Sequence, residues 1–122
     1  MGDRPSVEVA RVYDPPGDDN GTRVLVDRLW PRGVRKDDPR AGRWLRAVAP
    51  STELRRWYSH RLERFDEFVA RYTAELETGE GAQALDELRR LLAEGPVVLV
   101  TATRDVAASH AAVLRDLLTR AA

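Results

Sequence analysis

Two short polar runs, each following a strongly apolar segment, hold the side chains best suited to chemistry. The first run begins at Asp27 and includes Arg28 and Arg32, and the second includes Arg104 and Asp105. Guanidinium groups bind carboxylates and phosphates through planar, bidentate hydrogen bonds. A carboxylate beside them, Asp27, could orient a ligand or exchange a proton with it. The two runs therefore predict a binding site for a small anion, with Arg104 and Asp105 on its opposite wall.

Each of these side chains also has a purely structural interpretation. Asp27 and Arg28 can pair with neighbouring groups, and Asp105 can cap the helix that follows it. Trp30 is a candidate ligand contact, but a tryptophan at this place more often closes the end of a core. We keep both interpretations open for all of them.

The two histidines of the chain, His60 and His110, give a weaker signal. His110 is the better candidate for acid–base chemistry, because it falls in the helix expected beside the second run. The neighbouring pair Ser109 and His110 diverges on a helix, so a serine–histidine catalytic pair is not expected. Two histidines among scattered carboxylates match no known metal-ligand spacing, and no phosphate-loop or dinucleotide motif is present. We predict neither a metal site nor a cofactor.

The elements that must position these residues follow from hydropathy patterns. Apolar, β-branched runs predict three strands, at residues 6–13, 23–27 and 96–101. Spacings of three and four residues predict helices at 41–48, 51–57 with Ser51 as N-cap, 62–76 ended by Gly79 and Gly81, and 85–92. A final helix, capped by Asp105, carries Ala111, Leu114 and Leu118 inward and places His110 five residues along it.

These elements predict the fold class. Strands at 23–27 and 96–101 are nearly continuous in apolar character, as in parallel strands buried on both faces. The expected fold is a single small α/β domain, a mostly parallel sheet of three or four strands with helices packed around it. If the two apolar strands are parallel, the polar runs lie at the carboxyl edge of the sheet, where ligands of such folds bind.

Length and composition agree with this picture. The 122 residues suit one domain, and 43% hydrophobic with 33% charged residues is a globular composition. Without cysteine, disulfides and thiolate metal sites are excluded. No apolar run is long enough for a membrane helix, and the polar first ten residues do not resemble a signal peptide, so we expect a cytoplasmic protein with no membrane partner.

The net charge of zero conceals a basic block. Residues 23–64 contain twelve basic and five acidic side chains, a net charge of +7. Within it, residues 43–64 interleave Trp44, Trp57 and Tyr58 with arginines, the materials of single-strand nucleic-acid binding. A nucleic-acid or regulatory binding module is therefore the alternative function. A third possibility is a structural partner in a larger assembly. Whether the chain is an enzyme stays open; if it is, acid–base or hydrolytic chemistry on a phosphorylated or carboxylated metabolite fits best, because no redox cofactor motif is present.

One stretch has a more specific pattern. The run VDRLWPRG at residues 26–33, together with 49–57 and the helix around Phe68 and Tyr72, resembles the YeaO-like family of short bacterial domains of unknown function, DUF488. The resemblance covers nearly the whole chain and implies a small α/β domain, but it brings no established activity. It supports a group of positions that match the family pattern: Tyr13, Arg23, Asp27, Arg28, Trp30, Arg32, Trp57 and His60. Thr101 and Ser109 depart from it, since relatives commonly have tyrosine and asparagine there.

Overall fold

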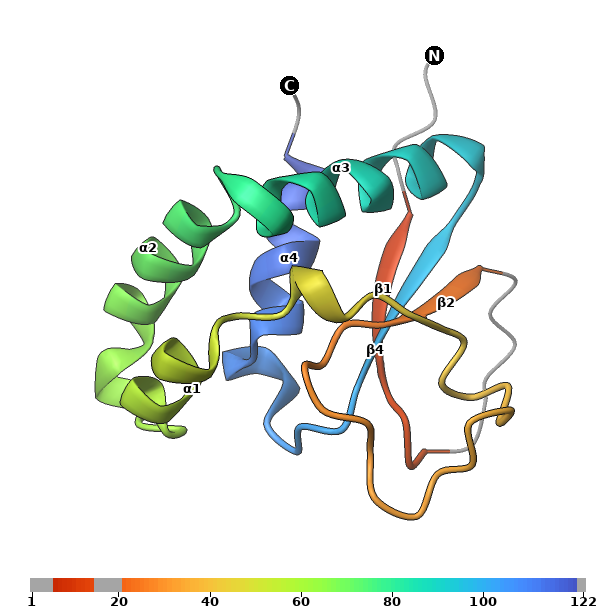
Figure 1. Ribbon diagram of the computed structural model, residues 1–122, viewed down its shortest axis with the longest axis horizontal. Helices are drawn as coiled ribbons and strands as arrows, with labels where there is room; N and C mark the ends of the chain where they lie inside the picture. Colours follow the sequence, from red (N-terminus) through yellow and green to blue (C-terminus); the bar gives the residue numbers. More distant parts are fainter. Residues whose placement is uncertain (1–5, 15–20, 121–122) are drawn as a thin grey trace.

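The computed structural model describes residues 6–14 and 21–120, and within these ranges it has the predicted α/β architecture. A four-stranded sheet forms from the described residues, with every pair parallel and the order β1-β4-β2-β3. The strands are β1 (Val7–Arg11), β2 (Thr22–Leu25), β3 (Arg43–Trp44) and β4 (Val97–Thr101). Figure 1 shows the strands together on one side of the molecule.

Helices cover one face of this sheet. They are α1 (Thr52–Tyr58), α2 (Phe65–Glu75), α3 (Gly79–Glu94) and α4 (His110–Thr119), with short 3-10 turns at η1 (Arg46–Val48), η2 (Leu62–Arg64) and η3 (Val106–Ala108). In Figure 1, α4 lies between the strands and the α1–α2 pair, and α3 runs across the top. The carboxyl ends of β2 and β4 therefore lead into loops at the edge of the sheet away from α3 (Figure 1).

Strand alternation explains how both sheet faces are buried. Val24 and Leu99 point into the large core shared with the helices, whereas Leu25 and Val100 belong to a second, smaller core. The second core is completed by Val34 and other residues of the loop that follows β2. Every residue of β4 is buried, as expected for a strand paired on both sides. The continuous apolar character of the sequence is thus the signature of a central strand.

The prediction of a helix at residues 41–48 is wrong. Arg43 and Trp44 instead form β3, and the Leu45 N–H donates to the Leu25 carbonyl at 2.9 Å. Gly42 makes this possible, because its φ of +65° is left-handed and a Cβ there would lie 2.2 Å from the Arg23 carbonyl oxygen. Pairing with β2 therefore overrides the helical spacing of the segment.

The two glycines expected to end the 62–76 helix lie elsewhere. That segment begins as the 3-10 turn η2, continues as α2 and ends at Glu75, whereas Gly79 and Gly81 belong to the first turn of α3. A Cβ at Gly81 would lie 2.7 Å from the Glu75 carbonyl oxygen. Gly81 therefore permits the close approach of α3 to the end of α2.

The start of the last helix also differs from the expectation. Asp105 precedes the η3 turn and its side chain caps no helix. The N-cap of α4 is Ser109, whose hydroxyl accepts from the Ala112 N–H at 3.4 Å and donates to the Val106 carbonyl at 2.6 Å. His110 is consequently the first residue of α4 and not five residues along it. The η3 turn takes up the residues that the sequence pattern assigned to the helix.

Replacing each of the two candidate N-cap residues with alanine tests which of them caps α4. Ser109→Ala is expected to lower the free energy of unfolding by about 1 kcal/mol, because it leaves an N-terminal N–H of α4 without its acceptor. Asp105→Ala should stay within about 0.5 kcal/mol of the wild type. Urea denaturation of both variants measures the difference, and a larger loss for Asp105→Ala would contradict the assignment of Ser109.

Candidate anion-binding cleft

The two polar runs meet at the carboxyl edge of the sheet. Because β2 and β4 are adjacent and parallel, Asp27 comes to lie beside Thr101 and Ala102, 74 and 75 residues away in the chain. One carboxylate oxygen, Oδ1, accepts from the Thr101 hydroxyl at 2.7 Å, and Oδ2 accepts from the Ala102 N–H at 2.8 Å. The carboxylate therefore bridges the ends of the two strands.

His110 completes this junction from the first turn of α4. Its Nε2 lies 3.0 Å from the Val26 carbonyl oxygen and 3.1 Å from Asp27 Oδ1. Both neighbours are acceptors, so Nε2 carries a proton and the ring is held in one orientation. Both side chains are nearly buried, at 12% exposure for His110 and 14% for Asp27.

The charge state of Asp27 follows from opposing effects. Burial raises the pKa of its carboxyl group, but the hydrogen bond and charge of His110 lower it, as do the bonds from Ala102 and Thr101. The net result is a pKa below the usual range. Asp27 is thus ionised near neutral pH, and its carboxylate accepts hydrogen bonds from three donors.

An open cleft of about 830 Å³ adjoins this junction. It contains nearly all the residues that the sequence singled out for ligand contact: Tyr13, Asp27, Arg28, Trp30, Arg32, His60, Arg104, Asp105 and His110. The structure adds residues that the sequence interpretation did not place there, chiefly Arg55, Arg56, Tyr58 and Phe68. The arginine pair was visible in the basic block, but no local pattern indicated that α1 borders the cleft.

The arginines of the cleft fall into two groups. Arg32, Arg55, Arg56 and Arg104 are exposed, and none of the four makes an ion pair or side-chain hydrogen bond with a described residue. Arg28 differs, because its Nε and one Nη donate to the carbonyl oxygens of Pro50 and Ala49 at 2.9 and 3.0 Å. Arg28 therefore anchors the segment before α1, with its remaining N–H groups at the cleft.

Aromatic side chains fix the loop that carries Arg32. Trp30 Nε1 donates to the Val34 carbonyl at 2.7 Å, and its ring meets Trp44 edge-to-face with the centroids 5.4 Å apart. Trp44 Nε1 in turn donates to the Asp27 carbonyl at 2.7 Å. Tyr13, from the end of β1, donates its hydroxyl to the Arg32 carbonyl at 2.9 Å. Trp30 thus has the packing role that was its alternative interpretation.

Trp57 does not join the site. It does not line the cleft, and its ring lies under two guanidinium groups, with Arg71 Cζ at 4.4 Å and Arg64 Cζ at 5.2 Å from the ring centroid. His60 does line the cleft, directly after Ser59; both residues adopt left-handed φ angles of 58° and 47°. This turn, with two non-glycine residues in the left-handed conformation, ends α1.

The arginines of the basic 43–64 segment do not form one continuous surface free of intramolecular contacts. Arg43 pairs with Glu87 at 2.6 Å, and Arg46 lies over the Trp44 ring at 5.8 Å. The Arg64 guanidinium lies over the Trp57 ring and donates a hydrogen bond to the Trp57 carbonyl. Only part of this segment, including Arg55 and Arg56, faces the cleft. Arg55 and Arg56 therefore contribute part of the segment's positive charge to the cleft, whereas Arg61 is exposed outside its lining.

The described residues contain neither a cluster of metal-ligating side chains nor a helix suited to a membrane. Among residues 6–14 and 21–120, no three histidine, cysteine, aspartate or glutamate side chains cluster as metal ligands would. None of the helices described in these ranges is long and apolar enough to cross a membrane.

The fold and the cleft define a class: a small α/β domain with a parallel sheet and an arginine-lined pocket at its carboxyl edge. The chain belongs to the DUF488 family, since the family model described as "Inactive DUF488-N3 subclade" matches residues 6–122. This confirms the YeaO-like resemblance.

Relatives are similar over nearly their full lengths. The uncharacterized protein Rv3073c of Mycobacterium tuberculosis (strain H37Rv) is 59% identical over 112 residues, 92% of each chain. Mb3100c of Mycobacterium bovis shows the same identity and coverage. The uncharacterized protein YeaO of Escherichia coli K12 is 36% identical over 113 residues, 93% of this chain and 96% of YeaO. No solved structure gave a significant match.

Proposed function

We propose that the protein binds a small phosphate- or carboxylate-bearing ligand in the cleft at the carboxyl edge of its sheet. The observation that carries the proposal is the set of four cleft arginines without a carboxylate partner among the described residues: Arg32, Arg55, Arg56 and Arg104. Guanidinium groups gathered in a concave surface create a field that attracts anions and offer fork-shaped donors to them. The lining contains only two carboxylates, those of Asp27 and Asp105, so this positive charge is only partly balanced.

The arrangement favours binding without turnover over the acid–base or hydrolytic chemistry expected for Asp27 and His110. Both carboxylate oxygens of Asp27 accept internal hydrogen bonds, and the Nε2 proton of His110 is directed at Val26 and Asp27. The word "inactive" in the description of the matching family model agrees with such a role. In this proposal Asp27 and His110 hold the cleft in shape, and the exposed arginines contact the ligand.

Thermal unfolding in the presence of anions tests the proposal. Phosphate, pyrophosphate and citrate, compared with chloride at equal ionic strength, should raise the Tm of the wild type. A ligand at 100 times its Kd stabilises the folded state by about 2.7 kcal/mol, a readily measured shift. Arg104→Gln and Arg32→Gln should each reduce the shift by at least about half, because each removes a charged bidentate donor.

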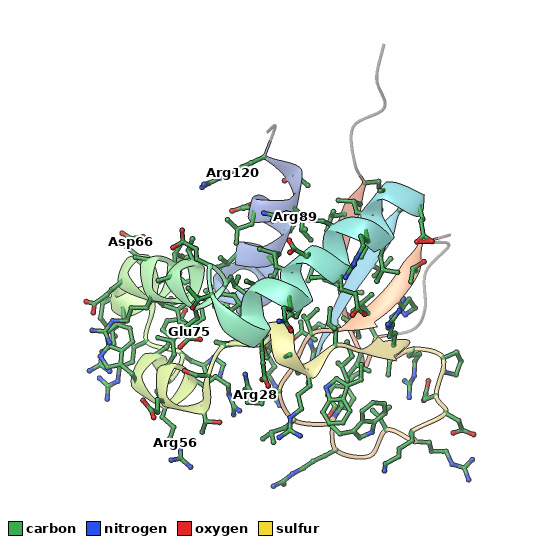
Figure 2. All side chains as sticks on the ribbon, turned by 45° about the horizontal axis from the view of Figure 1, so that its top comes forward. Arg28, Arg56, Asp66, Glu75, Arg89 and Arg120 are labelled. Carbon is green, nitrogen blue, oxygen red and sulfur yellow. The ribbon has the colours of Figure 1, made fainter. Side chains whose placement is uncertain are left out.

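A matched control is available on α3. Arg89 is also exposed, and its one polar side-chain contact with a described residue is a surface ion pair with Asp86 at 3.6 Å. In Figure 2, Arg89 lies well apart from Arg28 and Arg56. Arg89→Gln should therefore keep the full anion-induced shift. Equal shifts in Arg89→Gln, Arg104→Gln and Arg32→Gln would mean that the anions act on the whole surface and would overturn the proposal.

A further inference from the structure

The cleft is larger than a bare anion requires, and its lining is partly apolar. Its volume of about 830 Å³ lies in the range of pockets that hold ligands of drug size. Apolar residues line it beside the arginines, including Leu29 and Tyr13, which are 60% and 42% exposed. Large apolar side chains exposed next to unpaired cations suit a ligand with an anionic group and an apolar body.

Tyr13 lies between the two arginine-bearing loops. Its hydroxyl donates to the Arg32 carbonyl at 2.9 Å. Arg11 lies over the Tyr13 ring with its Cζ 6.0 Å from the centroid, and Arg11 Nε donates to the Thr103 carbonyl at 3.2 Å. Thr103 directly precedes Arg104. These contacts hold an exposed aromatic ring beside the backbone of both Arg32 and the Arg104 loop.

An acceptor completes this part of the cleft. Asp105 is exposed, lines the cleft and makes no ion pair or side-chain hydrogen bond with a described residue. An ionised carboxylate only accepts hydrogen bonds, so it suits hydroxyl or amino groups and repels phosphate. The cleft lining thus offers an aromatic ring at Tyr13, guanidinium groups at Arg32 and Arg104, and a carboxylate acceptor at Asp105.

We infer that the cleft binds a nucleoside phosphate, with its base stacked on Tyr13, its phosphate held by Arg32 and Arg104, and Asp105 accepting from sugar hydroxyls. The inference rests on the proposed function and specifies its ligand class. A nucleotide joins a flat ring system, hydroxyl donors and a phosphate in one molecule, and aromatic side chains stack on any base because each base has a π-face. Inorganic phosphate would use only the arginines.

Calorimetric titration of the full chain with phosphate, ribose 5-phosphate, adenosine and AMP at constant ionic strength tests this inference. Base stacking on one aromatic side chain corresponds to roughly 5- to 100-fold in affinity. AMP should therefore bind at least about 5-fold more tightly than ribose 5-phosphate. Tyr13→Ala should remove that difference between AMP and ribose 5-phosphate. Tyr13→Phe, which loses the hydrogen bond to the Arg32 carbonyl but keeps the ring, should retain most of the difference, so the two variants separate stacking from an effect on the Arg32 loop. The unfolding transition of each variant confirms that it is folded.

The outcomes separate this inference from the function on which it rests. Equal affinities for ribose 5-phosphate and AMP would overturn nucleoside recognition and leave anion binding supported. Absence of binding by all four probes, with the wild type folded, would overturn both. A single-stranded oligonucleotide that binds far more tightly than AMP, with an affinity that falls steeply with salt, would replace the nucleotide by nucleic acid as the ligand.

Discussion

Replacing Asp27 with alanine is expected to lower the free energy of unfolding by about 3–5 kcal/mol, the range for removing a nearly buried ionised group from its hydrogen-bonded partners. The carboxylate is nearly buried and accepts from the Thr101 hydroxyl, the Ala102 N–H and His110 Nε2. Its removal leaves all three donors with fewer partners and disconnects the ends of β2 and β4 from the start of α4. Thr101→Val is the matched control: it removes one of these bonds and should reduce stability by only about 1 kcal/mol.

The loss of unfolding free energy caused by Asp27→Ala should decrease at low pH. Since the pKa of Asp27 is lower in the folded protein than in the unfolded chain, its ionised form stabilises the fold. That contribution is complete above the unfolded pKa of about 3.9 and is lost as the pH falls through the folded pKa. The difference between wild type and Asp27→Ala should therefore be largest near pH 7 and shrink below about pH 4.

Urea unfolding followed by tryptophan fluorescence at pH 7 and pH 3 measures both quantities. A difference between wild type and Asp27→Ala that is under about 1 kcal/mol at pH 7, or that grows on acidification, would contradict the bridging role of the carboxylate.

Replacing Arg28 with alanine is expected to reduce stability by about 2–4 kcal/mol, because two charge-assisted hydrogen bonds are lost and two buried carbonyl groups lose their donors. Those carbonyls belong to Ala49 and Pro50, both buried. Arg28→Lys should recover less than half of the loss, since an ammonium group lacks the planar fork that reaches two acceptors.

The segment anchored by Arg28 shows why this effect is large. Tyr72 donates its hydroxyl to the Val48 carbonyl, and burial raises the pKa of Tyr72 well above its usual range, so the hydroxyl keeps its proton. Glu75 accepts from the Ser51 N–H at 2.8 Å and from its hydroxyl at 2.6 Å. Residues 48–51 are thus held by side chains from α2 and from the loop after β2, and they set the position of α1.

Arg32→Gln is the matched control for Arg28, since Arg32 is exposed in the same loop and its side chain bonds to no described residue. Its stability should stay within about 0.5 kcal/mol of the wild type. Chemical denaturation of both variants makes the comparison. Equal losses for Arg28→Ala and Arg32→Gln would show that the contacts to Ala49 and Pro50 contribute little. This division is also why the test of the proposed ligand binding uses variants of Arg32 and Arg104 and not of Arg28.

Local patterns were sufficient for the main elements of the fold. The apolar run at 96–101 predicted a buried strand, which is the central strand β4, and Ser51 was predicted as the N-cap of α1, where its hydroxyl accepts from the Leu54 N–H. Such features depend on residues close in sequence: strand burial on side-chain type, and helix capping on one side chain and the first turn. The same locality allowed the sequence to indicate polar, arginine-rich loops at the carboxyl edge.

The tertiary structure decided which of those residues share a site and which serve the fold. Arg28 and Arg32 look equivalent in the sequence, yet only Arg28 meets the Ala49 and Pro50 carbonyls, 21 and 22 residues away. Pairing with β2 turned Arg43 and Trp44 from a predicted helix into a strand, and Trp57 became packed under Arg64 and Arg71 instead of entering the cleft. The physical reason is that a guanidinium, carboxylate or indole takes its role from the partner the folded chain places beside it, and strand order and helix packing, which no local pattern encodes, place that partner.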